Sequence, residues 1–173
     1  DVQRAIQQEY ERLHAEWLAS SEFTGAVEKR TALLFPLQVW VRGDEDRAVV
    51  RTVLAVDEDA QTMTFAGDVA EGSLAQLMRA TTDRLVDAAG EAGAVASLAG
   101  GGPALAVAVG CVGRRLLLGR RTEDELDAVL AALGPDDDLV GFYSYGELAP
   151  TGVGGCALHN QTMTLLVVRE RAG

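Results

Sequence analysis

The sequence contains few cysteines, few basic residues and no long apolar run. Cys111 and Cys156 are its only thiols, too few for a disulfide framework, so we expect a reducing compartment and a cytoplasmic location. Glycine or arginine interrupts each apolar run before it reaches the ~20 residues that a membrane-spanning helix needs, so we expect no membrane segment. The sequence also has no internal repeat and no low-complexity tract.

Basic residues are outnumbered by acidic ones. The chain has 15 Lys and Arg against 26 Asp and Glu, which gives a formal net charge of -11. Such a chain repels polyanions unless its cations gather on one face. The basic cluster "GRRLLLGRR" is followed at once by the acidic stretch that begins at Glu123, which favours a solvated or salt-bridged helix. We therefore expect no nucleic-acid partner.

The length of 173 residues is sufficient for one domain with a real hydrophobic core. Because the chain begins at Asp1 rather than at a methionine, we interpret it as part of a longer protein. Apolar side chains recur at helical spacing over residues 2–18, which predicts an opening helix with one apolar stripe. We assign residues 1–34 to this helix and a linker, and residues 35–173 to the domain itself.

Three strands and a helix are expected next. The strands cover residues 36–42, 48–56 and 62–67, and the segments between them have the Asp and Gly content of tight turns. Ser73 and Gln76 have the spacing of a capping box, which predicts a helix over residues 73–93.

The second half of the sequence predicts a strand, a helix and two more strands. "ALAVAVGC" is continuously apolar, as expected for a central strand buried on both faces. Thr122 and Glu125 form a second capping box for a helix that ends before Gly134, although this helix can also begin earlier, near Arg115. "LVGFYSYG" and "TMTLLVVRE" read as the last strands. The order α-β-β-β-α-β-α-β-β indicates an α+β fold, with a mixed, largely antiparallel sheet covered by helices.

One segment near the end of the chain has an unusual composition. Residues 141–164 combine aromatic side chains, a carboxylate, several glycines, a thiol, a histidine and an asparagine. "GFYSYGELAP", followed after a glycine-rich spacer by "LHNQTMTL", resembles the signature of the C-terminal half of FIST domains. "VVRTV", "DVAEGS", "VGCVGRRLLLG" and "TEDELDAV" fit the same family in the same order. The resemblance covers roughly residues 35–170.

The resemblance implies a non-enzymatic, cytoplasmic sensory module that binds a small molecule such as an amino acid. In this family the C-terminal half normally follows an N-terminal FIST half, beside signalling modules such as kinases, or behind an F-box in eukaryotes. Residues 1–34 would then form the junction to that N-terminal half. The sequence has no cofactor fingerprint, so we expect no cofactor, and homo-oligomer formation remains open.

Glu147 is the first candidate for a ligand contact. It follows an apolar strand, where a carboxylate must be paired or must face a cavity. It either binds the amine of a ligand or forms a buried ion pair with Arg51 or Arg114. In the first case, Arg51 or Arg114 would hold the carboxylate of an amino-acid ligand.

Other candidates surround Glu147 in the sequence. Cys111 ends the central strand, where open α/β sheets place ligands, but we favour the alternative that it is a small buried apolar residue without a function. His159 and Asn160 precede the last strand, where they can either fix a loop or reach a ligand. The complete set of candidate ligand contacts comprises Arg51, Cys111, Arg114, Tyr143, Ser144, Tyr145, Gly146, Glu147, His159 and Asn160.

Two other functional classes compete with the sensory module. A thiol enzyme would use Cys111 or Cys156 as nucleophile, His159 as base and Glu147 to orient the base. An interaction domain without a ligand would depend on the surface instead. Cys156 and His159 form a single C-x-x-H with no second pair, so we expect no metal site.

Overall fold

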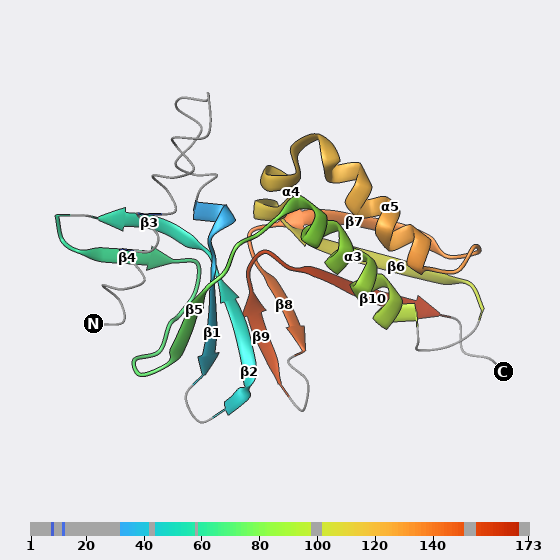
Figure 1. Cartoon of the computed structure of the whole chain (residues 1–173). Helices are drawn as coiled ribbons and strands as arrows, with labels where there is room; N and C mark the ends of the chain where they lie inside the picture. Colours follow the sequence, from blue (N-terminus) through green and yellow to red (C-terminus); the bar gives the residue numbers. More distant parts are fainter. Residues whose placement is uncertain are drawn as a thin grey trace. The chain divides into compact units, whose positions relative to one another are not determined.

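The computed structural model describes residues 32–41, 44–57, 59–97, 102–150 and 155–169, together with Gln8 and Arg12. The chain divides into two compact units, Asp1–Ala80 with Thr151–Val153, and Thr81–Pro150 with Gly154–Gly173. Their elements are labelled in Figure 1. Apart from Gln8 and Arg12, the helix predicted over residues 2–18 lies outside the described residues.

The described part of the first unit is built mainly from strands (Figure 1). Its sheets consist of β1 (Leu37–Val41) between β2 (Asp44–Arg51) and β5 (Leu74–Leu77), and of β3 (Val53–Asp57) paired with β4 (Thr62–Phe65). All of these pairs are antiparallel. The strand predicted over residues 48–56 is interrupted at Thr52, so it contributes to both sheets. Leu37 and Val39 of β1 are each 2% exposed. Together with Val49 of β2, which pairs with Val39, they belong to the buried core of this unit.

The helix predicted to begin at Ser73 is wrong in its first part. Leu74–Leu77 forms β5, which pairs with β1 over the register that joins Leu37 to Leu77. Pairing with the edge of β1 satisfies the backbone of this segment and overrides the local capping pattern. The helix begins only at Thr82, where the hydroxyl of Thr81 accepts a hydrogen bond from the Arg84 N–H at 3.3 Å.

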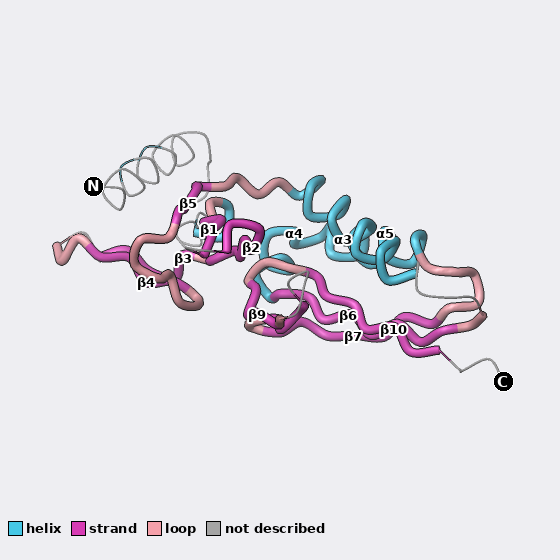
Figure 2. The backbone as a smooth tube through the Cα atoms, turned by 90° about the horizontal axis from the view of Figure 1, so that it is seen from below, coloured by secondary structure: helices cyan, strands magenta, loops and turns pink. Residues whose placement is uncertain are grey.

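The second unit contains a three-stranded sheet with helices on one face (Figure 2). β6 (Ala104–Cys111) lies between β10 (Met163–Arg169), to which it is antiparallel, and β7 (Asp138–Ser144), to which it is parallel. The helices α3 (Thr82–Ser97) and α5 (Thr122–Ala132) pack on this sheet. Their shared core contains Ala89, Ala106, Val129 and Leu133. With antiparallel pairs predominating in both units, the α+β prediction is confirmed.

The central strand β6 is buried on one face only, so the expectation of burial on both faces is wrong. The helices cover the side chains of Ala104, Ala106 and Ala108, whereas Leu105 on the opposite face is 42% exposed. We call this opposite side of the sheet the outer face. Strand alternation and register assign to it Leu105, Val107, Val109, Asp138, Val140, Phe142, Thr164, Leu166 and Val168.

The helical segment after β6 begins earlier than the second capping box predicts. It consists of α4 (Val112–Leu118), the 3-10 turn η1 (Gly119–Arg121) and α5. Thr122 already has helical angles, and its hydroxyl donates to the Gly119 carbonyl at 2.7 Å instead of capping the helix. The predicted end is confirmed, because α5 stops at Ala132, before Gly134. None of the described helices is both long and apolar enough to cross a bilayer.

The hairpin of β8 (Glu147–Pro150) and β9 (Cys156–His159) was not predicted. The sequence between these strands is rich in glycine, which is typical of a loop. In addition, β8 ends in a proline, Pro150, and each strand has only four residues. Glu147 pairs with His159 in this hairpin. The pairing brings the carboxylate next to the start of β10, which is where the candidate site lies.

Candidate functional site

A row of polar side chains crosses the sheet at the carboxyl ends of β6 and β7. The register pairs Cys111 with Ser144. On the other side, the backbone N–H of Cys111 donates to the carbonyl of Thr162 at 3.0 Å. All three residues continue the outer-face alternation of their strands. The last set of neighbouring side chains on the outer face therefore consists of the hydroxyl of Ser144, the thiol of Cys111 and the hydroxyl of Thr162. The sets that precede it along the strands are mainly apolar.

Glu147 closes this row with a buried carboxylate that is 1% exposed. Its Oε1 accepts a hydrogen bond from the Ser144 hydroxyl at 2.9 Å, and its Oε2 accepts one from the Thr162 hydroxyl at 3.0 Å. Burial raises the pKa of Glu147, while these hydroxyls, the Thr162 backbone and the Cys111 thiol act in the opposite direction. Among the described residues we find no ion pair to Glu147. The carboxylate is thus held by neutral groups in a site that disfavours its charge.

A second buried carboxylate, Glu125, is paired. Its Oε2 accepts from Nε and Nη2 of Arg114 at 2.7 and 2.5 Å, and its Oε1 accepts from the Tyr143 hydroxyl at 3.1 Å. Glu125 is 0% and Arg114 2% exposed. Burial, followed by the neighbouring Glu125, raises the pKa of Tyr143 to about 12. Charge and hydrogen bonding are therefore both satisfied at Glu125.

Arg114 pairs with Glu125, so the proposed ion pair between Arg114 and Glu147 is wrong. Two of its other N–H groups donate to the carbonyls of Leu85 at 2.6 Å and Gln161 at 3.4 Å. The sequence alone could not identify Glu125 as the partner, because its contact with Arg114 forms only in the folded chain.

Arg51 belongs to the first unit. Its Nε donates to the carbonyl of Asp68 at 2.9 Å and its Nη1 to the carbonyl of Val50 at 3.1 Å. Burial lowers the pKa of this guanidinium, partly offset by the negative charge of Asp68. These two hydrogen bonds join Arg51 to backbone carbonyls of its own unit.

The remaining candidates lie around the β7–β8 turn and the loop before β10. Tyr145 is 91% exposed, and Gly146 accepts from the Ser144 hydroxyl at 3.1 Å. Asn160, 2% exposed, donates to the carbonyl of His159 at 3.2 Å, as expected for a side chain that fixes a loop. The structure thus gathers Cys111, Ser144, Gly146, Glu147, His159 and Asn160 in one unit, with Arg114 and Tyr143 beside them.

Sequence reasoning missed Glu125 and Thr162 as members of this region. A signal for Glu125 was present, since Glu125, Val129 and Leu133 follow each other at four-residue spacing and all three are buried. A carboxylate on the apolar stripe of a helix needs a buried partner. Thr162 carried no comparable signal, because its role depends on the β8–β9 hairpin.

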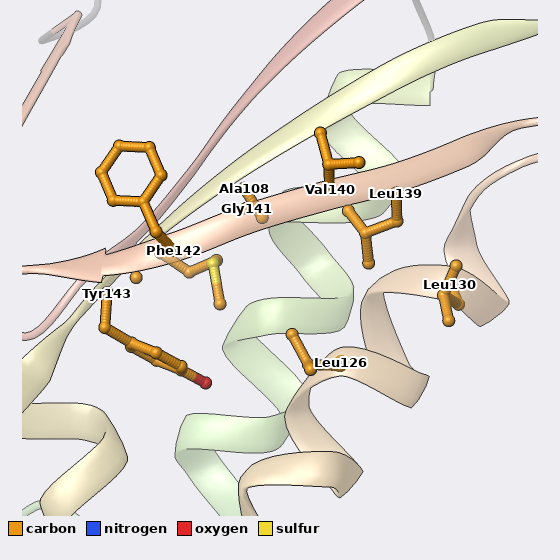
Figure 3. Close-up of a pocket in the computed structure, with 10 residues that line it drawn as sticks. Ala108, Leu126, Leu130, Leu139, Val140, Gly141, Phe142 and Tyr143 are labelled. Carbon is orange, nitrogen blue, oxygen red and sulfur yellow. The ribbon is translucent and has the colours of Figure 1, made fainter.

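A cavity of about 280 Å³ lies between β7 and α5. Figure 3 shows Leu139 and Tyr143 directed toward α5, whereas Val140 and Phe142 are directed to the opposite side of the strand. Its lining is almost entirely apolar. Ala108, Gly110, Leu126, Leu130, Leu139, Val140, Gly141, Phe142, Tyr143 and Met163 form it.

The two thiols are expected to differ strongly in reactivity. Cys111 is buried, and burial together with the nearby Glu147 raises its pKa, although backbone N–H groups oppose this shift. A raised pKa is unfavourable for a thiolate nucleophile. Cys156 is exposed. In titration with a thiol-specific chromogenic disulfide, we expect one fast thiol, lost in Cys156→Ser, and one that reacts only on unfolding. A fast thiol lost in Cys111→Ser would instead support the enzyme hypothesis.

Within the described residues, no group of three or more His, Cys, Asp or Glu side chains is placed to hold a metal ion. The model of the FIST C domain matches residues 9–150, most of the chain. Comparisons with curated proteins and with solved structures found no match.

Proposed function

Because the chain belongs to the FIST C family of sensory signal-transduction domains, we propose that it is a non-enzymatic module that binds a small molecule at the carboxyl ends of β6 and β7. The proposed ligand resembles an amino acid and places its ammonium group against Glu147. We further propose that the module works in the cytoplasm and passes its signal to an N-terminal FIST half or an adjacent signalling domain.

The observation that carries this proposal is that the carboxylate of Glu147 is buried without an ion-pair partner among the described residues. A buried carboxylate is costly unless a positive charge or several hydrogen bonds compensate for its desolvation. Glu147 is 1% exposed, and its described hydrogen-bond partners are neutral. An ammonium group would supply the positive charge together with three donors. The hydroxyls of Ser144 and Thr162 can rotate to accept two of them.

The surroundings of Glu147 also suit the apolar part of such a ligand. The next row of the outer face contains Val109 and Phe142, and Phe142 is 63% exposed. A ligand side chain on this row would bury apolar surface on both partners. The carboxylate of the ligand is assigned to no arginine, because Glu125 and two backbone carbonyls already occupy Arg114.

Thermal unfolding in the presence of amino acids and simple amines tests the proposal. A ligand that binds only the native state raises the midpoint, because at 100 times its dissociation constant it stabilises that state by about 2.7 kcal/mol. We expect one class of ammonium compound to stabilise the wild type and to lose its effect in Glu147→Gln. Glu123→Gln makes the same chemical change at an exposed position of α5 and should retain the full effect.

The unliganded Glu147→Gln variant provides the internal control. The folded-state pKa of Glu147 is raised, so its stabilising contribution is present below the unfolded pKa and is lost as pH rises through the folded pKa. At neutral pH the variant should therefore be at least as stable as the wild type. A variant that is several degrees less stable, with no ligand effect in either protein, would make Glu147 a structural residue and refute the proposal.

A further inference from the structure

Strand β7 forms one edge of the described part of its sheet. Natural edge strands are usually protected by charged side chains, proline or a bulge, because their free N–H and C=O groups can pair with another chain. The sequence of β7, DLVGFYS, contains no proline and only one charged residue, Asp138 at its first position. This edge lacks the usual protection.

Both sides of the β7 edge are apolar. On the outer face, Val140 is 52% and Phe142 63% exposed. On the helix side, the cavity between β7 and α5 is lined by Leu126, Leu130 and Leu139 (Figure 3), and Leu130 is 45% exposed. A strand added to this edge would therefore bury apolar side chains on both of its faces, which is how strand addition combines backbone hydrogen bonds with side-chain pockets.

We propose that the occupant of this edge is β7 of a second copy of the chain. The two strands pair antiparallel about a twofold axis at Gly141 and join their sheets into one. In this register Val140 faces Phe142 of the other copy, and Leu139 faces Tyr143. The first is a pairing of a β-branched with an aromatic side chain, a favourable cross-strand combination. A twofold interface requires a self-complementary surface, and β7 alternates apolar residues on both faces.

Charge favours this register as well. The chain has a net charge of -11, so two copies repel each other over most of their surfaces. In the proposed pairing the only charged residue of β7, Asp138, faces the hydroxyl-bearing Ser144 of the other copy rather than its own equivalent. Gly141 has no side chain at the axis, where the two backbones approach each other. The exposed Leu130 of each α5 extends the contact beyond the strands.

Introducing charges at the facing positions 140 and 142 tests both the dimer and its register. The mass of the 173-residue chain in solution is measured by sedimentation velocity from about 1 to about 100 µM, a range that detects micromolar dissociation constants. We expect the wild type to be dimeric at the upper end, and V140E/F142E, which places like charges opposite each other, to be monomeric. V140K/F142E instead places a positive charge opposite a negative charge of the other copy and should restore the dimer.

Leu166→Glu on β10 is the matched control. Leu166 lies on the same outer face and is 63% exposed, but it belongs to the opposite edge strand, separated from β7 by β6. The substitution Leu166→Glu should therefore leave the dimer intact. The proposal is overturned if the wild type is monomeric throughout this range. It is also overturned if Leu166→Glu abolishes a dimer that V140E/F142E retains, or if V140K/F142E fails to restore association. Circular dichroism confirms that each variant is folded.

Discussion

Arg114→Met is expected to destabilise the protein by about 3–5 kcal/mol, the usual cost of removing one partner from a buried ion pair. Arg114 and Glu125 are 2% and 0% exposed. The methionine preserves most of the apolar stem of arginine but removes the guanidinium, so Glu125 retains only the hydrogen bond from Tyr143. The carbonyls of Leu85 and Gln161 lose their donors as well. Urea unfolding followed by circular dichroism measures this loss.

Arg115→Met is the matched control for this experiment. Arg115 is exposed, belongs to the same helix and lies 5.5 Å from the ring centre of Tyr143. Its loss should cost at most about 1 kcal/mol, the size of an exposed cation–π interaction. The double variant Arg114→Met/Glu125→Gln should recover part of the stability, because it leaves no buried charge. Equal losses for Arg114→Met and Arg115→Met would contradict the assigned role of the ion pair.

The sequence predicted those elements of the fold whose patterns are local. The apolar run of β6 and the end of α5 before Gly134 appear where expected. The errors arise where pairing with a distant segment of the chain determines the secondary structure. Leu74–Leu77 carries a plausible capping pattern, yet it becomes a strand because β1 offers an edge to it. That edge belongs to a segment distant in the sequence, and a local pattern contains no information about such pairing.

The candidate site was only partly predictable for the same reason. Glu147 was identified because a carboxylate after an apolar strand must be compensated. What compensates it depends on the β8–β9 hairpin, which places Thr162 next to Glu147. Likewise, Arg114 was recognised as a buried cation, but its partner Glu125 lies on another helix and resembled a capping residue. The sequence showed which residues need a buried partner, whereas only the folded structure shows which residues are the partners.

Gly141→Ala is expected to have a comparably large effect through packing rather than charge. Gly141 lies opposite Ala108 in the parallel pair of β7 with β6. A Cβ at this position would overlap the backbone carbonyl oxygen of Ala108. A backbone group of a central strand cannot move aside like the end of a flexible side chain. We therefore expect a loss of about 3 kcal/mol, the upper part of the range for overpacking.

Gly90→Ala, the same chemical change within α3, should have the opposite sign. A Cβ at Gly90 would meet its nearest atom, the carbonyl oxygen of Ala128, at 3.5 Å, an ordinary van der Waals contact. Alanine is favoured over glycine in a helix by up to about 1 kcal/mol, so this variant should be stabilised. Urea unfolding of both variants measures the difference. If Gly141→Ala were also neutral or stabilising, β7 would not be held against β6 as closely as the register indicates. The alignment of Ser144 with Cys111 would then lose its structural basis, because the same β6–β7 pairing positions both residues.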